Sequence, residues 1–184
     1  AQGGGADSIT LHVRGDRRHM QDADALSVRE SVALPLNLEM GNTPEMVDFA
    51  LRLKPDYICM VPEKREEITT EGGLDAVFHE KDLAPTMARM ADNGIQVSLF
   101  IDPEVPQVEA AARLGAPMIE LHTGCFANHS GRERTEELAR LKRAAELAHS
   151  LGIQVNAGHG INYQNLEQLL AGVPWLHELN IGRA

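Results

Sequence analysis

Short runs of aliphatic residues recur along the chain and alternate with longer segments in which apolar residues return every three or four positions. Their starts fall roughly 20 to 40 residues apart, which is the length of a strand followed by a crossover helix. We therefore expect repeated βα units and a parallel sheet. The runs lie at residues 9–13, 34–40, 57–62, 95–102, 118–124, 153–160 and 176–182.

Two of the segments between these runs carry signals for the start or the end of a helix. Thr43 is a candidate N-cap, and Pro44 stands at the first helical position. The charged segment 132–152 ends at Gly152, a residue that commonly terminates helices. Both segments have an apolar stripe at helical spacing, which predicts amphipathic helices packed on the sheet. The stripes comprise Val47, Ala50, Leu51, Leu138, Leu141, Ala145 and Ala148.

Five of the expected strands combine an apolar face with a polar face, because side chains alternate along a strand. If helices cover the outside of a barrel, the apolar faces must meet them and the polar faces must point inward. The inward sets are Thr10, His12 and Arg14; Asn37 and Glu39; Glu120 and His122; Gln154 and Asn156; and Glu178 and Asn180.

Seven strand–helix repeats of similar length, with no GxGxxG motif after any strand, favour a closed barrel over a doubly wound sheet. The predicted fold class is therefore α/β, a (β/α)₈ TIM barrel. An eight-stranded barrel usually needs about 200 residues or more, so we expect the first βα unit and part of the C-terminal end to be missing. No low-complexity linker interrupts the chain, and residues 1–184 are expected to form a single barrel domain, incomplete at both ends.

The inward polar residues gather toward the carboxyl ends of their strands, where barrel enzymes place their chemistry. Burying Glu39 or Glu120 without a partner would cost several kcal/mol, so these side chains must pair with one another or with a ligand. Together with His12, they suit general acid–base catalysis. They could equally bind a divalent metal. A single inward histidine could also be only a hydrogen-bonded structural residue.

Three further segments could hold an anion. His159 stands between two glycines whose backbone N–H groups can cradle a phosphate. Residues 17–19, Arg-Arg-His, follow the first strand as a candidate phosphate or sugar clamp, or as a solvated charged loop. The polar segment 63–73 could be a lid with Thr69 and Thr70 as ligand contacts, or a plain surface loop.

Composition and charge limit the classes of molecule that this protein is expected to bind. The net charge of −10 argues against nucleic acid and anionic membranes, although a local arginine cluster can still bind a small phosphate. No apolar stretch approaches the length of a membrane span. Cys59 and Cys125 are isolated in or beside apolar runs, which indicates reduced packing residues in a cytosolic protein.

Several blocks of this sequence resemble the pyridoxine 5′-phosphate synthase family, and the resemblance covers the whole chain. The blocks are TLHVRGDRRHM, LNLEM, VPEKREEITTEGGLD, GIQVSLFID, IELHTGCFA, VNAGHGINY and HELNIG. The resemblance implies a closed (β/α)₈ barrel that assembles as a homo-octamer in the cytoplasm. It also implies the condensation of 1-deoxy-D-xylulose 5-phosphate with 3-amino-2-oxopropyl phosphate to pyridoxine 5′-phosphate, phosphate and water, without a metal or another cofactor.

The resemblance also assigns roles to residues of this chain. His12 and Glu39 correspond to proton acceptors, His159 to the proton donor, and Glu120 to an acidic residue that stabilises charge. The positions that would hold the deoxyxylulose phosphate are Arg14, His19 and Thr69, and those that would hold the aminoketone phosphate through the backbone are Gly160 and Gly182. The family's first strand, with its Asn-x-Asp-His contacts, has no counterpart here, and the segment after HELNIG differs.

Two other functions fit the same residues. A metal-dependent sugar-phosphate isomerase or lyase barrel would use the inward His and Glu side chains as ligands. A non-catalytic sugar-phosphate-binding barrel would explain the anion contacts, but it would not need the interior carboxylates and histidines.

Overall fold

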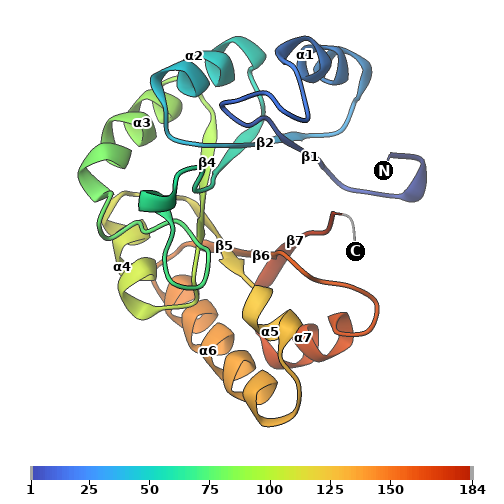
Figure 1. Cartoon of the computed structure of the whole chain (residues 1–184), viewed down its shortest axis with the longest axis vertical. Coiled ribbons are helices and arrows are strands. Elements are labelled where there is room, and N and C mark those ends of the chain that lie inside the picture. Colours follow the sequence, from blue (N-terminus) through green and yellow to red (C-terminus); the bar gives the residue numbers. More distant parts are fainter. Residues whose placement is uncertain (1, 183–184) are drawn as a thin grey trace.

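A computed structural model describes residues 2–182 as alternating strands and helices (Figure 1). The strands are β1 (Ile9–His12), β2 (Leu36–Met40), β3 (Tyr57–Met60), β4 (Gln96–Ile101), β5 (Met118–His122), β6 (Gln154–Gly158) and β7 (Leu176–Asn180). The α-helices are α1 (Asp22–Ser31), α2 (Pro44–Leu53), α3 (Glu80–Asp92), α4 (Val105–Arg113), α5 (Gly124–Asn128), α6 (Gly131–Ser150) and α7 (Leu166–Gly172). Short 3-10 helices lie at Gln2–Gly4 and Arg65–Glu67. Each expected strand is confirmed to within a few residues at its ends.

The strands form one parallel sheet in the order β1-β2-β3-β4-β5-β6-β7. Figure 1 shows this sheet curling, with the helices around its outer side. This arrangement confirms the α/β barrel-type fold. Within residues 2–182, β1 and β7 are not paired with each other, so the sheet is open between them. A cavity of about 930 Å³ lies at this opening, with lining residues from both edge strands. The closed barrel implied by the resemblance is therefore not formed by the described residues.

The two faces of the strands divide as the alternation predicts. Leu11, Leu36 and Leu38 are buried in the apolar core between sheet and helices. The opposite face is polar and also largely buried: Asn37, Ser98 and Asn156 are each less than 9% exposed. The inside of the curled sheet is thus lined by hydrogen-bonding groups, an unusual interior for a fold whose barrels are commonly filled with branched aliphatic residues.

Helices α2 and α6 show how local signals place the outer layer. The Thr43 hydroxyl accepts a hydrogen bond from the Met46 backbone N–H at 3.3 Å and caps α2, as predicted. Helix α6 is followed by Gly152 with φ of +77°, a conformation that costs glycine little and ends the helix. Helix α5 is an addition that the hydrophobic pattern did not predict, since it has five residues and no apolar stripe.

The polar segment 63–73 folds back on itself beside the carboxyl ends of the strands. It contains the 3-10 helix Arg65–Glu67 and an antiparallel bridge between Ile68 and Leu74. The Glu63 carboxylate accepts hydrogen bonds from the Gly15 backbone N–H at 3.0 and 3.1 Å, which ties the start of the segment to the loop after β1. The segment is therefore held by its own hydrogen bonds.

Across the described residues, no helix combines the length and the apolar character that crossing a membrane would require.

Candidate active site

A cavity of about 530 Å³ opens at the carboxyl ends of the strands. The structure brings the four predicted catalytic side chains to its lining, together with the two glycines predicted to contact phosphate through the backbone. These six residues are His12, Glu39, Glu120, His159, Gly160 and Gly182, and Asn180 lies among them. They come from both edges and from the middle of the sheet, so the curl of the sheet is what brings them together.

The two carboxylates of the cavity are joined by one amide. The Asn180 side-chain nitrogen donates to Glu39 Oε1 at 2.6 Å and lies 3.5 Å from Glu120 Oε2. Glu120 is 5% exposed. Its burial and the nearby charge of Glu39 raise the pKa of the Glu120 carboxyl to about 8, so this group carries a proton at neutral pH. The inward position of Asn180 follows from strand alternation, but its bridging role does not.

A thiol contacts the same carboxyl group. Cys59 Sγ lies 3.8 Å from Glu120 Oε2, and burial raises the pKa of this thiol well above its ordinary value. Cys59 is a free cysteine, as predicted, and its side chain points toward the polar interior. It is thus a neutral, weak donor beneath the cavity.

Gly158 leaves the space that the Glu120 carboxyl group occupies. A Cβ atom on Gly158 would overlap Glu120 Oε1, and it would lie 3.2 Å from the Asn180 Cβ. Gly158 is the last residue of β6, so the need for glycine here is steric and arises from a neighbouring strand.

His12 and Glu39 form a close pair on adjacent strands. Their register positions are opposite each other in β1 and β2, and His12 Nδ1 lies 3.5 Å from Glu39 Oε2. The second ring nitrogen, His12 Nε2, is buried and has no hydrogen-bond partner among the described residues. A buried nitrogen with an unused hydrogen-bonding capacity at a cavity wall is suited to contact a ligand.

His159 adopts a backbone conformation that is uncommon for a residue with a side chain, with φ of +82°. The Thr123 hydroxyl holds this turn, since it lies 2.7 Å from the Gly158 carbonyl oxygen and 2.6 Å from that of His159. Partial burial of the ring, followed by the charge of His122, lowers the pKa of His159. Thr123 is fully buried, and no sequence pattern marked it.

A buried carboxylate that the sequence interpretation missed lies directly after β4. Asp102 Oδ1 is 3.3 Å from His122 Nδ1 and accepts a hydrogen bond from the Gly73 backbone N–H at 3.0 Å. Asp102 Oδ2 accepts a hydrogen bond from the Thr69 hydroxyl. Burial alone would raise the pKa of Asp102, but these donors outweigh it and lower the pKa. The one sequence signal was an acidic residue at the end of an otherwise apolar strand.

Three predicted phosphate contacts do not line the cavity formed by the described residues. Arg14 Nε lies 3.6 Å from Asp16, and His19 is exposed. Thr69 directs its hydroxyl to Asp102. Their predicted roles in binding deoxyxylulose phosphate remain predictions.

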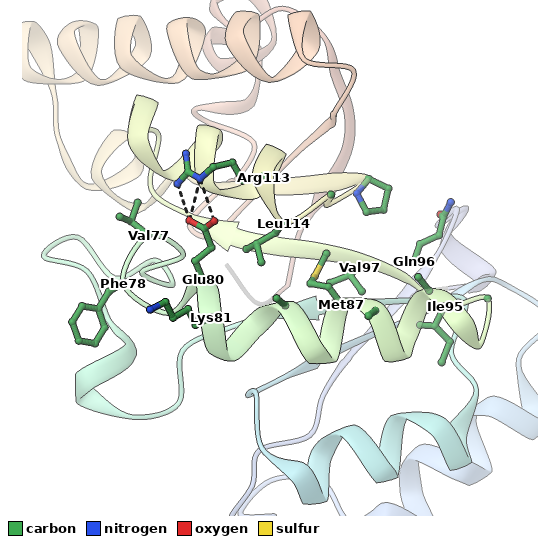
Figure 2. Close-up of a pocket in the computed structure, with 16 residues that line it drawn as sticks. Val77, Phe78, Glu80, Lys81, Met87, Ile95, Gln96, Val97, Arg113 and Leu114 are labelled. Carbon is green, nitrogen blue, oxygen red and sulfur yellow. Dashed lines mark hydrogen bonds and ion pairs between the residues drawn. The ribbon is translucent and has the colours of Figure 1, made fainter.

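A wider cavity of about 960 Å³ lies outside the sheet, between α3 and α4 (Figure 2). Its floor is apolar, with Met87, Val97 and Leu114, and Arg113 forms an ion pair with Glu80 at 2.8 Å across one end. Of the charged side chains in Figure 2, Arg113 and Glu80 are paired with each other and Lys81 is exposed. Because it lacks a convergent set of free acid–base groups, we do not assign the chemistry to this groove.

Comparison with known proteins decides the family. A model of the family described as pyridoxal phosphate biosynthesis protein PdxJ matches residues 1–184. The chain belongs to this family. It is 99% identical over 182 residues to a pyridoxine 5′-phosphate synthase from Akkermansia muciniphila, covering 99% of this chain and 74% of that protein. It is 50% identical over 181 residues to the enzyme of the same name from Coxiella burnetii, covering 98% of this chain and 75% of that one.

Membership of the PdxJ family makes this chain part of an enzyme family, since the relatives are named as synthases. The fold has a wider distribution. A crystal structure of monomers of dimeric phosphoribosylanthranilate isomerase from Thermotoga maritima superposes with a TM-score of 0.60 over 98% of this chain and 77% of that chain. At 11% sequence identity, this likeness shows the barrel-type fold alone.

Proposed function

We propose that this PdxJ-family chain condenses 1-deoxy-D-xylulose 5-phosphate with 3-amino-2-oxopropyl phosphate to form pyridoxine 5′-phosphate, phosphate and water. The proposed mechanism is general acid–base catalysis without a metal or another cofactor. Joining an amine to a ketone, eliminating phosphate and water, and aromatising the ring all require proton transfers at successive positions of the ligand. The side chains around the 530 Å³ cavity can supply such transfers.

The observation that carries this proposal is the pair of carboxyl groups held in different environments by one amide. The pKa of Glu120 is raised to about 8 by burial and by the charge of Glu39, so Glu120 can donate a hydrogen bond at neutral pH. Glu39 is more accessible and lies beside His12. Two carboxyl groups in such different environments can serve as an acid and a base within one site.

His12 and Glu39 are proposed to accept protons, and His159 to donate one. The lowered pKa of His159 makes its protonated ring a stronger acid, and the ring must receive that proton from the ligand or solvent in an earlier step. Gly160 and Gly182 are proposed to present backbone groups to the aminoketone phosphate. Arg14, His19 and Thr69 are proposed to hold the other phosphate, for which Thr69 must turn away from Asp102.

The metal-dependent alternative finds no support in the geometry of this cavity. Within the part of the chain that the structure describes, one set of three potential ligands gathers closely: Glu71, Cys125 and Glu137. The Arg140 guanidinium already lies 2.8 Å from both carboxylates of that set. His12, Glu39 and Glu120 do not form such a set.

The test is to incubate the full-length protein with both substrate phosphates in EDTA and detect pyridoxine 5′-phosphate by mass spectrometry. We expect product, and we expect Glu39→Gln to lower kcat by about 10²- to 10⁴-fold, since the amide cannot accept a proton. The exposed residue Glu133 provides a matched control, and Glu133→Gln should retain activity.

Two results would contradict the proposal. Turnover that requires an added divalent metal would assign the cavity to a metal-dependent sugar-phosphate enzyme. Binding of either phosphate without turnover, unchanged in Glu39→Gln, would indicate a non-catalytic binding barrel. Assembly as a homo-octamer and a cytoplasmic location remain predictions.

A further inference from the structure

The Asp102–His122 pair lies outside the proposed set of catalytic residues, yet it is among the most tightly held groups of the molecule. Both residues are at most 8% exposed. Asp102 accepts from Gly73, from Thr69 and from His122, three donors on two different segments. A buried carboxylate with this many donors is fixed in position, so it can fix in turn the imidazole that contacts it.

The contacts of Asp102 determine which nitrogen of His122 carries a proton. The hydrogen bonds to Asp102 lower the pKa of its carboxyl group, so the carboxylate is ionised at neutral pH and cannot donate. His122 Nδ1, 3.3 Å from Asp102 Oδ1, must therefore be the donor of this hydrogen bond. In the neutral ring, the free lone pair then belongs to Nε2.

The surroundings of Nε2 are open because two neighbouring residues are glycines. A Cβ atom on Gly124 would lie 2.6 Å from His122 Nε2, and a Cβ on Gly72 would lie 3.9 Å from it. Phe100 contacts the ring edge to face, with centroids 5.0 Å apart, and fixes its orientation. Nε2 has no hydrogen-bond partner in residues 2–182.

His122 faces the same space as the proposed catalytic residues. It lines a cavity of about 250 Å³ that shares Gly72, Phe100 and His159 with the 530 Å³ cavity. The rings of His122 and His159 have their centroids 4.9 Å apart. A ligand atom that contacts His159 is thus within reach of His122 Nε2.

We propose that His122 is a further proton-transfer residue of this site, and that Asp102 is the residue that positions it. His122 Nε2 takes a proton from the bound ligand, the electron pair of the broken bond stays on the ligand, and the resulting imidazolium is stabilised by the ionised Asp102. The proton then returns to a leaving group or to water. Because Asp102 also binds Thr69 and Gly73, the geometry of His122 is linked to the ordered state of segment 63–73. This inference rests on the proposed function for its kinetic test.

The first measurement requires no turnover. In full-length protein labelled with ¹⁵N-histidine, the nitrogen shifts of His122 should report a proton at Nδ1. In Asp102→Asn, whose amide can donate, the proton should move to Nε2. An Nε2-bound proton in the wild-type protein would overturn the proposal.

The second measurement is kinetic, with wild-type turnover as its reference. His122→Ala should lower kcat by about 10²- to 10⁴-fold while KM changes by less than about threefold. Added imidazoles should restore the rate in proportion to their basicity, which a merely structural role would not produce. His122→Gln serves if the alanine variant does not fold. The control is His79→Gln. His79 does not line the cavity, and its Nδ1 lies 3.5 Å from Asp82 Oδ2.

The outcomes separate the two proposals. Absence of product from the wild-type protein refutes the proposed function, whereas the nitrogen shifts still test the pairing of Asp102 and His122. An active wild-type protein with undiminished kcat in His122→Ala, or without rescue by imidazoles, refutes the role of His122 alone.

Discussion

The Asn180 amide allows two acidic side chains to lie at the wall of one cavity. Its nitrogen donates to Glu39 and approaches Glu120, so neither carboxyl group is left without a donor. A proton on Glu120 avoids the cost of burying its charge and the repulsion between the two carboxylates. The site therefore stores a neutral acid next to a base, and this property depends on single atoms contributed by β2, β5 and β7.

Replacement of Glu120 by Gln should change how stability depends on pH. The pKa of Glu120 is about 8 in the folded chain, above its ordinary value of 4.5, so the folded state holds a proton that the unfolded state releases in this interval. Stability of the wild-type protein should thus fall as pH rises from about 5 to about 8, by up to about 1.4 kcal/mol per pH unit from this group. Glu120→Gln should lack this contribution.

Urea unfolding at several pH values measures the difference. The free energy of unfolding of Glu120→Gln should decline less steeply than that of the wild type, while the exposed control Glu133→Gln should parallel the wild type. Parallel curves for Glu120→Gln and the wild type would show that Glu120 is ionised in the folded chain.

At the scale of elements, segment 63–73 is tied to α6 by a salt-bridge cluster centred on Arg140. Arg140 lies 2.8 Å from Glu71 of the segment and 2.8 Å from Glu137, and it also pairs with Glu104 at the start of α4. Arg140 is about one-fifth exposed at its side chain, which limits screening by solvent. The cluster places Gly72 against the ring of His122.

Glu71→Gln should loosen this segment without unfolding the sheet and its helices. Loss of a charge-assisted pair of this kind should cost about 1 to 2 kcal/mol in local opening, which corresponds to about 5- to 30-fold faster cleavage by trypsin after Lys64 or Arg65. The exposed pair between Arg132 and Glu136 on the same helix gives the control Glu136→Gln. Equal cleavage rates in the two variants would mean that the hydrogen bonds of Glu63 and Thr69 hold the segment by themselves.

Strand alternation and helix signals account for most of what the sequence predicts correctly. The inward positions of His12, Glu39 and Glu120 follow from the two-residue period of a strand. When the apolar residues face the helices, the residues between them must face the inside of the sheet. Asp102 and Thr123 escape this reasoning because they lie just beyond strand ends, where no period applies. The Thr69 hydroxyl donates a hydrogen bond to Asp102, which lies 33 positions along the chain, so no local pattern predicts this contact. The bridging of two carboxyl groups by Asn180 depends on sheet curvature, which no local pattern encodes.

For the whole molecule, the open edges of β1 and β7 are the main departure from a barrel. Among residues 2–182, the central strands β4 and β5 have partners on both sides, whereas β1 and β7 each have one. Edge strands leave backbone groups to water and open more readily.

Hydrogen exchange followed by mass spectrometry should therefore show graded protection in the 184-residue chain. Amides of β4 and β5 should exchange slowest, and amides of β1 and β7 should exchange at least tenfold faster, roughly the factor given by 1.4 kcal/mol of local stability. Strands β2 and β6 lie next to the edge strands and have two neighbours each, so their exchange rates can be compared with those of β1 and β7. Equal protection of β1 and β4 would indicate that another segment or another copy of the chain pairs with the edge.

The hydrogen bond between Asn180 and Glu39 joins residues 141 positions apart. A ribosome adding about 5 to 20 residues per second makes Glu39 roughly 7 to 28 seconds before Asn180. Glu120 is also made before Asn180, so in the last part of that interval a nascent chain carries both acidic groups of the cavity without the amide that joins them. The chemistry proposed for this site thus cannot arise before β7 is made, which follows the synthesis of the other six strands of the described sheet.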